Sequence, residues 1–281
     1  MDANDSVAAC RSCATLSRVN LLASCLAVAV GVATSATAAA DPVPSFRLMT
    51  YNLEYDNAAP EASLDAIAAA DADVVVLQEV DEGWQARLAK RFPATAGARY
   101  PNQQYQLQAR RAGGLAILSK LPIKTRETYA SPNTGWFPAD RLVVTAPFGD
   151  VQILNVHLRP AIEGGSWLRG YLSTPPLRLA EIQAYWKHVD AALPTIVAGD
   201  FNEAPSGTSV AFLEARGLAR AATSGPPTWH LEKTIAGKRT DLMTFDLDHV
   251  MLRGLDGREG RVLDAGTSDH RPVLVTVSPK P

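Results

Sequence analysis

Cysteine is scarce in this chain of 281 residues, and its three copies, Cys10, Cys13 and Cys25, all lie before residue 40. Residues 41–281 have none, so neither a disulfide nor a thiol nucleophile can contribute to the structure or chemistry of that part. Cys10 and Cys13 have the spacing of a redox or zinc motif. No second pair accompanies them, so we expect no such site there.

Several common enzyme signatures are also missing. The sequence has no Walker A loop, no H-E-x-x-H segment and no G-x-G-x-x-G loop. Ser268 is not part of a G-x-S-x-G elbow, so we do not expect it to act as a hydrolase nucleophile.

An excess of basic charge is absent as well. The chain has 27 basic and 29 acidic side chains, a net charge of −2. Proteins that bind duplex nucleic acid usually carry a basic stripe, and here only local pairs such as Arg110-Arg111 and Lys238-Arg239 occur. Tight duplex binding is therefore disfavoured. A nuclease remains open, because metal ions can offset phosphate charge at the site.

Residues 1–40 differ in composition from the rest. A polar stretch with Arg11 and Arg18 leads into the apolar run Leu21–Val30, and small residues with A-x-A cleavage sites follow before Asp41. This layout is typical of a secretory signal peptide. An uncleaved anchor is the alternative, but the glycine, serine and threonine content makes a poor membrane span. We expect cleavage and export to the periplasm or outside the cell, with no transmembrane helix in the mature chain.

Residues 41–281 are expected to form one domain, since 47% of the chain is hydrophobic and 20% is charged. Apolar runs and periodicity predict the following elements. The expected strands are 46–53, 73–77, 114–119, 141–146, 151–158, 195–198, 248–252, 260–263 and 273–277, and the expected helices are 61–70, 81–92, 176–193 and 208–216. Hairpins mixed with βα units indicate an α/β sandwich of two sheets with helices outside. Residues 160–175 have no clear secondary structure, and loops of this length are often functional.

Polar groups follow several apolar runs at the point where each run ends. Asp200 and Asn202 follow Ile196–Gly199, and Glu79 follows the run that ends at Leu77. Burying a carboxylate is costly unless a cation or hydrogen-bond donors compensate it. An Asx turn closing a strand is the alternative for Asp200 alone. Four further segments of the same kind, around Asn52, Asn155, Asp248 and Asp269, favour a functional site.

Seven short motifs occur in the order TYNLE, LQEV, GGLAILSK, NVHL, GDFN, LDHV and SDHRPV between Phe46 and Val277. In this order the chain resembles the endonuclease/exonuclease/phosphatase superfamily, which includes DNase I-like nucleases, abasic-site endonucleases, inositol polyphosphate phosphatases and bacterial sphingomyelinases. The resemblance implies a four-layered α/β sandwich, two mixed sheets flanked by helices, with the active site at one end of the sheets. It identifies the superfamily better than the substrate.

Glu79 is the best single candidate for a metal ligand, because it ends a strand that is otherwise apolar. A solvated strand end is the alternative. The resemblance adds Asn52 on the metal side of the site and Asp269 near a second metal position, and it leaves the role of Glu54 open. Hard oxygen ligands favour Mg²⁺ or Mn²⁺.

The resemblance also assigns the candidate catalytic groups. Asp200 orients or deprotonates the attacking water, and Asn202 donates hydrogen bonds to the phosphate. The two alternate along a segment expected to be extended, so both can project to the same side. His157 matches a phosphate-contacting histidine, and His270 is expected to be held by Asp248. The remaining histidines, His188 on a helix, His230 on a loop and His249 on a strand, are expected to be structural.

The leading hypothesis is a metal-dependent phosphohydrolase that cleaves phosphodiester bonds by direct attack of water, with nuclease-type activity favoured because His157 accompanies the core set. A lipid or small-molecule phosphatase or phosphodiesterase, sphingomyelinase-like or acting on inositol phosphates, is the alternative. A non-catalytic binding module would have lost some of the candidate residues, and all are present. The expected partner is a phosphate-ester substrate, nucleic acid being one option, and we expect a monomer.

Overall fold

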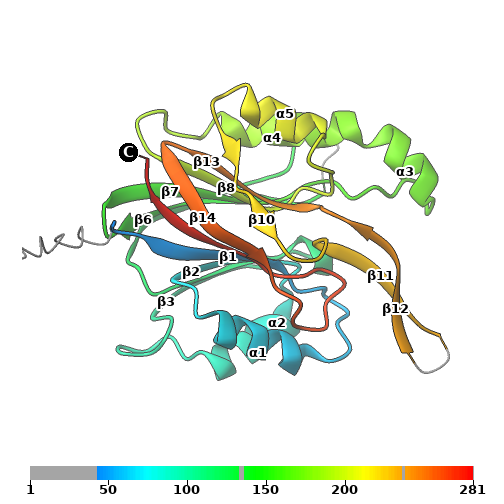
Figure 1. Cartoon of the computed structure of the whole chain (residues 1–281), viewed down its shortest axis with the longest axis horizontal. Helices are drawn as coiled ribbons and strands as arrows, with labels where there is room; N and C mark the ends of the chain where they lie inside the picture. Colours follow the sequence, from blue (N-terminus) through cyan, green and yellow to red (C-terminus); the bar gives the residue numbers. More distant parts are fainter. Residues whose placement is uncertain (1–42, 133–135, 236–237, 281) are drawn as a thin grey trace, which may run out of the picture. The chain divides into compact units, whose positions relative to one another are not determined.

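The computed structural model describes residues 43–132, 136–235 and 238–280. The predicted signal peptide, residues 1–40, lies outside the described residues. Within the described residues, two large mixed β-sheets stack face to face, and helices cover the outer face of each (Figure 1).

The seven-stranded sheet has the strand order β10-β14-β15-β1-β2-β4-β3. Its strands are β1 (Phe46–Asn52), β2 (Val74–Gln78), β3 (Asn102–Gln106), β4 (Leu115–Ser119), β10 (Thr223–Ser224), β14 (Leu255–Val262) and β15 (Val273–Pro279). β1 pairs in parallel with β2 and antiparallel with β15.

The six-stranded sheet has the order β5-β6-β7-β8-β13-β9. Its strands are β5 (Ile123–Tyr129), β6 (Ala139–Ala146), β7 (Gly149–His157), β8 (Thr195–Asp200), β9 (Ala219–Arg220) and β13 (Asp248–Arg253). β7 and β8 are parallel, and β8 pairs antiparallel with β13, so the centre of this sheet repeats the strand directions of β2, β1 and β15.

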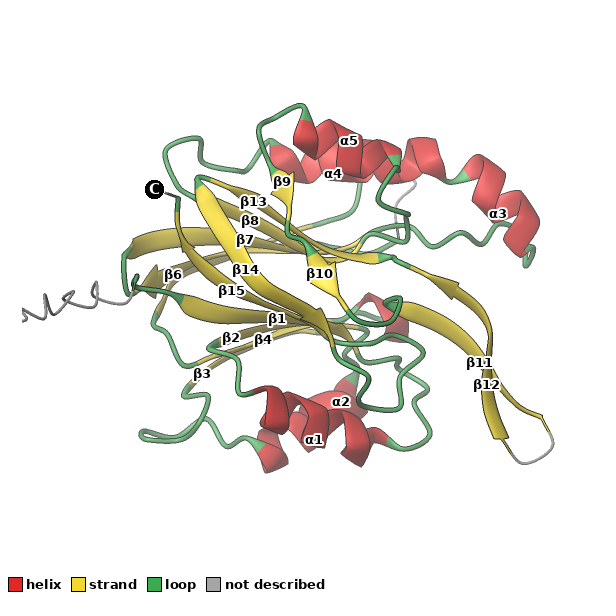
Figure 2. Cartoon of the chain, in the orientation of Figure 1, coloured by secondary structure: helices red, strands yellow, loops and turns green. Residues whose placement is uncertain are grey.

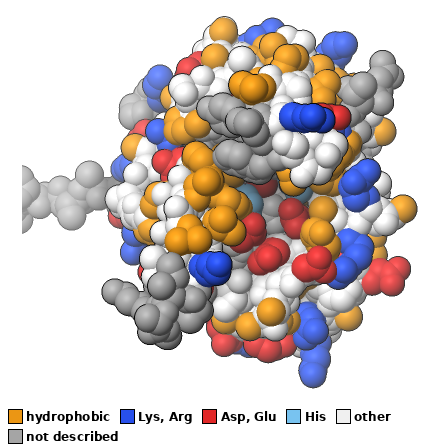
Figure 3. Space-filling model, turned by 90° about the vertical axis from the view of Figure 1, so that its right-hand side faces the viewer, with side chains coloured by type: hydrophobic (Ala, Val, Ile, Leu, Met, Phe, Trp, Pro, Cys, Tyr) orange, Lys and Arg blue, Asp and Glu red, His pale blue; other side chains and the backbone are white. Residues whose placement is uncertain are grey.

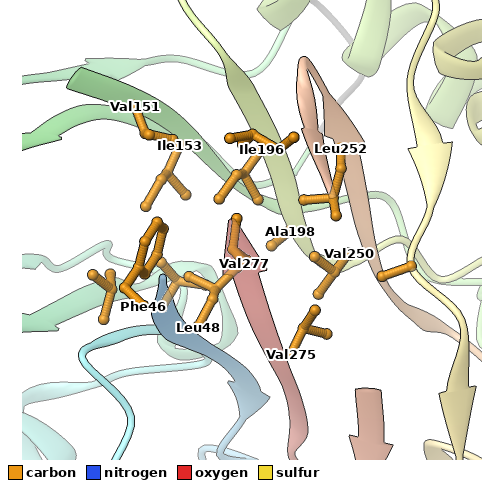
Figure 4. Packing of buried hydrophobic residues seen from close by; sticks show 14 of the residues in the cluster. Phe46, Leu48, Val151, Ile153, Ile196, Ala198, Val250, Leu252, Val275 and Val277 are labelled. Atoms are coloured by element: carbon orange, nitrogen blue, oxygen red, sulfur yellow. The ribbon is translucent and has the colours of Figure 1, made fainter. Parts of the chain in front are cut away.

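The space between the sheets is filled by small apolar side chains from both. Figure 4 shows Leu48 and Val275 from one sheet facing Ile153, Ala198 and Val250 from the other. Neighbouring residues along each strand point the opposite way and pack beneath helices. Because the central strands are buried on both faces, they read in the sequence as continuous apolar runs.

Four of the helices form the outer layers (Figure 2). α1 (Pro60–Ala70) and α2 (Glu82–Arg91) pack on the seven-stranded sheet through Leu64, Ile67 and Leu88, while α4 (Pro175–Trp186) and α5 (Thr208–Glu214) pack on the six-stranded sheet. Asp81 caps α2, as predicted, by accepting a 2.9 Å hydrogen bond from the Trp84 N–H. The predicted four-layered sandwich is confirmed.

Two predictions between residues 160 and 193 were wrong. Residues 160–175 contain a helix, α3 (Trp167–Ser173), whose N-cap Ser166 accepts a hydrogen bond from the Arg169 N–H. The helix predicted to reach residue 193 ends at Trp186. The buried Gln152 side chain draws the following segment onto β7, because its oxygen accepts the Asp190 N–H at 3.0 Å.

The sequence patterns did not reveal the hairpin of β11 (Trp229–Ile235) and β12 (Lys238–Phe245), which extends away from the two sheets (Figure 1). Strands β3, β5, β9 and β10 were also missed. They are edge or two-residue strands with little apolar burial, so they lack the apolar runs on which the predictions depend. Among the described residues, no helix is long and apolar enough to cross a membrane.

Candidate active site

The carboxyl ends of four strands meet at one end of the two sheets. Asn52, His157 and Asp200 are the last residues of β1, β7 and β8, and Glu79 directly follows β2. Each parallel pair of strands ends at one edge of its sheet, and the stacked sheets bring both edges together. Asn52 therefore contacts Asp200, 148 positions further along the chain.

The Asn52 amide holds two carboxylates side by side. Its Nδ2 donates to Glu79 Oε1 at 3.2 Å and to Asp200 Oδ2 at 3.0 Å. Its Oδ1 accepts the Glu54 N–H at 3.0 Å and keeps a second lone pair. Glu79 Oε2 accepts the Tyr55 N–H at 3.1 Å, so each oxygen of this carboxylate accepts a hydrogen bond and its orientation is held.

His157 lies against the same two acids. Its Nε2 is 3.5 Å from Asp200 Oδ2 and 3.9 Å from Glu79 Oε1. Its Nδ1 is 3.2 Å from the carbonyl oxygen of Ala112, which can only accept, so Nδ1 carries a proton. The Phe137 ring stacks on the imidazole with centroids 4.1 Å apart. A neutral His157 therefore presents a lone pair at Nε2, and only the imidazolium can donate from that nitrogen.

The predicted pairing of His270 with Asp248 is present. His270 Nδ1 lies 2.8 Å from Asp248 Oδ2, and its Nε2 is 3.5 Å from Asp200 Oδ2. Ser268, rejected as a nucleophile from the sequence, accepts the His270 N–H at 3.0 Å and donates to the Asn52 carbonyl at 2.7 Å. Its hydroxyl therefore fastens the histidine loop to β1.

Asn202 reaches the site by a different route from the one predicted. The strand ends at Asp200, and Asn202 adopts a left-handed conformation with φ of 50°, so the two residues do not alternate along an extended segment. Asp200 Oδ1 accepts the Asn202 N–H at 2.8 Å, and Asn202 Nδ2 lies 3.2 Å from Asp200 Oδ2. A turn closed by the aspartate side chain, rather than strand periodicity, brings the pair together.

Glu54 and Glu79 share this left-handed conformation, with φ of 58° and 59°. Non-glycine residues rarely adopt it, and each costs of order 1 kcal/mol unless the surroundings compensate. That three such residues lie around one group of carboxylates shows that the loops after β1, β2 and β8 are shaped to present side chains rather than to relax.

Asp269 lies at the edge of the group. Its Oδ2 accepts a 2.9 Å hydrogen bond from Trp229 Nε1, and its N–H donates to Glu54 Oε2 at 3.1 Å. The Trp229 contact could not be predicted from the sequence, because it comes from the unpredicted hairpin. Glu54, left open from the sequence, orients the Asp269 backbone.

Burial sets the electrostatics of the acids. It raises the pKa of Glu79 to about 7 and raises the pKa of Asp200 above its ordinary value. Burial also lowers the pKa of His157 to about 4, so this imidazole is neutral at pH 7. For His270, burial alone lowers the pKa, but the carboxylates of Asp248 and Asp200 outweigh it and raise the pKa well above the ordinary value. His270 is therefore the cation of the site.

These residues form the floor of a cleft of about 810 Å³. Figure 3 shows acidic side chains and histidine gathered in the hollow. The lining combines the candidate residues with others from α5, the loops and the β11–β12 hairpin: Tyr55, Glu79, Arg110, Arg111, Trp136, Phe137, His157, Arg178, Asp200, Asn202, Glu203, Thr208, Trp229, Phe245, Asp269 and His270.

Arginines on the cleft wall are the main functional candidates that sequence reasoning left unassigned. The Arg110 guanidinium carbon lies 4.4 Å from the Trp136 ring centroid, and that of Arg159 lies 3.5 Å from it. Arg178 lines the cleft and is almost fully buried, with its Nε 3.8 Å from Glu203 Oε1 and its Nη1 donating to the Arg159 carbonyl and Thr174 Oγ1. The Arg110-Arg111 pair was the available signal, but only the fold brings it to the cleft wall, where Arg111 pairs with Asp56 and Asp81.

The other histidines have structural contacts. His249 Nε2 lies 2.8 Å from the Glu203 carbonyl on the far face of β13, as predicted, and His188 stacks on Tyr129 with centroids 3.7 Å apart. His230 lies on β11 and not on a loop, and His188 follows the end of α4 and is not on a helix, which corrects both predicted placements.

The donor set fits a hard divalent cation. The Asn52 Nδ2 brings one oxygen of Glu79 and one of Asp200 to the same nitrogen, and Asp248, Asp200 and His270 have ligand atoms within 4.8 Å of one another. Asp248 Oδ1 is buried without a hydrogen-bond partner. A cation beside Glu79 would remove the penalty that raises its pKa, which is the behaviour expected of a metal ligand.

Comparison with known proteins agrees with the observed fold. The model of the Endonuclease/Exonuclease/phosphatase family matches residues 49–270. No curated protein sequence matches the chain.

Solved structures share the fold at low sequence identity. Sphingomyelinase C from Streptomyces griseocarneus is 22% identical over 83% of this chain and 99% of its own, with a TM-score of 0.60. A functionally unknown conserved protein from Enterococcus faecalis V583 is 19% identical over 83% and 100%, with a TM-score of 0.66. TDP2 from D. rerio, solved with a single-strand DNA product, is 15% identical over 83% and 99%, with a TM-score of 0.61.

Proposed function

The chain belongs to the endonuclease/exonuclease/phosphatase family of phosphoric ester hydrolases, and on that premise we propose that it is a Mg²⁺- or Mn²⁺-dependent phosphodiesterase of nuclease type. The observation that carries the proposal is the convergence of Glu79, Asp200, His157 and His270, with Asp200 Oδ2 3.5 Å from each imidazole. Glu79 and Asn52 would hold the metal, and Asp269 lies where a second could contact the site. When bound, the ion supplies charge neutralisation at the phosphate oxygens.

Asp200 is the group that receives the proton of the attacking water. Burial raises its pKa, and a base works best when its pKa approaches the pH of the reaction. The Asn202 N–H and the Asn52 amide fix both of its oxygens, so the carboxylate keeps one orientation. No residue of the site forms a covalent intermediate in this scheme, since the water attacks phosphorus directly.

His270 donates to the phosphate as charge develops on it. Asp248 keeps the imidazole protonated and oriented, and the raised pKa of His270 keeps the proton in place at neutral pH. His157 contacts the phosphate from Nε2 as an imidazolium, a form that a negatively charged substrate stabilises. The Asn202 Nδ2 donates to Asp200 Oδ2 at 3.2 Å and to the Leu158 carbonyl at 3.0 Å, so one of these hydrogen bonds would have to break for the amide to donate to the same phosphate.

The cleft wall favours a substrate that carries further negative charge. Arg110 and Arg178 line the cleft, and guanidinium groups already lie over the Trp136 ring. A cationic headgroup would need aromatic faces without competing cations, whereas consecutive phosphates of a nucleic acid would be attracted to this wall. The absence of a basic stripe across the sequence favours single-stranded or short substrates over tightly held duplex DNA.

One observation favours a lipid phosphodiester as the second candidate. Leu231, Leu242 and Met243 on the β11–β12 hairpin are 49%, 51% and 40% exposed. Exposed apolar side chains beside a phosphodiesterase cleft suit contact with a lipid surface. The similarity in fold to sphingomyelinase C agrees with this candidate without selecting it.

The same proposal includes export. Residues 1–40 have the composition of a signal peptide, and the domain that follows has no cysteine. Export to the periplasm or outside the cell would place the enzyme where extracellular phosphodiesters are available, and cleavage near Asp41 would release it.

Parallel assays test the proposal. The purified protein should cleave single-stranded DNA, RNA or plasmid DNA in Mg²⁺ or Mn²⁺, lose that activity in EDTA and regain it when the metal is restored. Sphingomyelin vesicles and inositol phosphates run alongside identify the lipid and small-molecule alternatives. His270→Ala should lose most of its activity, while His188→Ala, which changes an exposed histidine, should behave as wild type. Full activity in excess EDTA would refute the mechanism.

A further inference from the structure

A second group of metal-ligating side chains lies on the β11–β12 hairpin, outside the candidate active site. Ligand atoms of His230, Glu232 and Asp241 all lie within 4.8 Å of one another. Glu232 and Asp241 are directly paired across the two strands, and His230 is two residues before Glu232 on β11. A β-bulge between Leu231 and Glu232 shifts the strand register, so that Leu231 pairs with Met243 and Glu232 pairs with Asp241.

The buried His230 imidazole has a ring nitrogen, Nδ1, without a hydrogen-bond partner. The residue is only 8% exposed. Leaving a buried polar atom unpaired costs about 1–3 kcal/mol, so a native structure normally supplies a partner. A metal ion held by the two neighbouring carboxylates would supply one.

The surrounding contacts hold the other ligands in place. Arg271 Nη2 donates to Asp241 Oδ2 at 3.0 Å. The backbone N–H of His230 donates to the Asp269 carbonyl at 2.9 Å, which holds this part of β11 in place. Metal-ligating carboxylates are characteristically hydrogen-bonded by outer contacts such as the one from Arg271 to Asp241. The arginine also offsets part of the negative charge, so the site suits a single divalent ion.

We propose that His230, Glu232 and Asp241 bind a divalent transition-metal ion of the Zn²⁺ type, which joins β11 to β12 near the base of the hairpin. One imidazole and two carboxylates are ligands of Zn²⁺, whereas Mg²⁺ prefers oxygen ligands alone. In a tetrahedral site with ligands at about 2.1 Å, donor atoms lie roughly 3.4 Å apart. The three ligand atoms lie within 4.8 Å of one another, so binding would require them to move closer together.

The site has a consequence for the cleft. Trp229 precedes His230 and donates to Asp269 Oδ2 at 2.9 Å, and Trp229 and Phe245 both line the cleft. An ion that joins β11 to β12 at this level would restrain the two aromatic rings. Its role is structural, since none of its three ligands is part of the acid and histidine group on the cleft floor.

The test uses Co²⁺ as the probe, because its visible absorption reports nitrogen and oxygen ligands and its binding quenches nearby tryptophan fluorescence. The full chain is stripped of metal and carries Glu79→Gln, which weakens the candidate catalytic metal site. We expect this protein to bind Co²⁺ with quenching of Trp229. Adding His230→Ala or Glu232→Gln should weaken that binding at least 10-fold, while adding His188→Ala should leave it unchanged.

Two further measurements complete the design. Equilibrium dialysis with Zn²⁺ should show one equivalent fewer in the His230→Ala protein than in its parent, and amide exchange across β11 and β12 should slow when Zn²⁺ is added to the parent only. Circular dichroism confirms that each variant is folded, and Glu232→Gln, which preserves shape, serves if His230→Ala is not. Equal Co²⁺ affinity in the parent and both variants, or no binding by the parent, would overturn the proposal.

Discussion

Replacing Glu79 with glutamine should make the metal-free protein more stable while it abolishes metal-dependent activity. Burial raises the pKa of this carboxyl from about 4.5 to about 7, and its side chain is only 16% exposed. A carboxyl that is harder to ionise in the folded state than in the unfolded state destabilises the fold wherever both are ionised. The conversion of 1.36 kcal/mol per pKa unit gives a penalty of about 3 kcal/mol.

The sign of the pH dependence follows from the raised pKa. Below about pH 4.5 the carboxyl is protonated in both states, and its contribution to stability is fully present. As the pH rises toward 7, the unfolded state ionises first, so stability is lost across that interval and is level above it. Asp200 adds a loss in the same direction, because burial raises its pKa too.

Glutamine removes the charge but also one acceptor. It can still accept the Tyr55 N–H, while its amide meets the Asn52 Nδ2 that now donates to Oε1. Losing that hydrogen bond costs about 1 kcal/mol. The net gain at pH 8 in EDTA should therefore be about 2 kcal/mol, and it should shrink as the pH falls toward 5.

Urea denaturation at pH 5 and pH 8, with and without EDTA, measures these quantities. In excess Mn²⁺ the order should reverse, since the ion binds the folded wild-type protein and stabilises it by mass action. Glu61→Gln, which changes an exposed carboxylate on α1, is the matched control and should show no such pattern. A Glu79→Gln protein no more stable than wild type at pH 8 in EDTA would refute the reasoning.

Three further predictions concern catalysis, packing and export. His270→Ala should lower kcat by about 10²–10⁴, and Asp248→Asn should lower kcat by no more than that. The kcat of the double variant should be little lower than that of His270→Ala alone. Additive losses in the kcat cycle would show that the pair does not work as one unit. Gly199→Ala should destabilise by about 3 kcal/mol in urea denaturation, because the added Cβ would lie 1.9 Å from the Val156 carbonyl oxygen, whereas at Gly217, which also has positive φ, nothing lies within 4 Å and the same change should cost less. N-terminal sequencing of secreted protein should begin near Asp41, and a product that still carries the preceding segment would contradict cleavage.

The apolar runs determined most of the layers. Val74–Leu77 and Ile196–Ala198 are apolar at every position, and only strands covered on both faces can bury such runs. Their polar ends also marked the candidate residues, because a carboxylate after a buried strand needs a compensating partner. The polar strand ends and the cap of α2 by Asp81 both depend on neighbouring residues in the chain, so both could be predicted from the sequence.

The geometry among those residues depends on the tertiary structure. Strand β8 delivers Asp200, but a left-handed turn and not strand alternation sets Asn202, since the Asp200 carboxylate captures the following N–H. Asn52 contacts Asp200 because the edges of the two stacked sheets lie side by side. The residue pattern within either strand carries no information about the distance between them.

The cleft wall and the hairpin lie furthest from what could be predicted. Arg110 and Arg178 belong to separate loops and helices that meet only when both sheets have formed, and β11 and β12 have mixed polar and apolar faces because they extend beyond the core. The sequence by itself therefore determined the buried central strands, the layers and the identity of the acids and histidines, since these follow from what each segment must bury. Only the packing of distant segments decided which groups are in contact, which acids have raised pKa values and which residues line the cleft. The reason is that desolvation and hydrogen bonding depend on every neighbour in space.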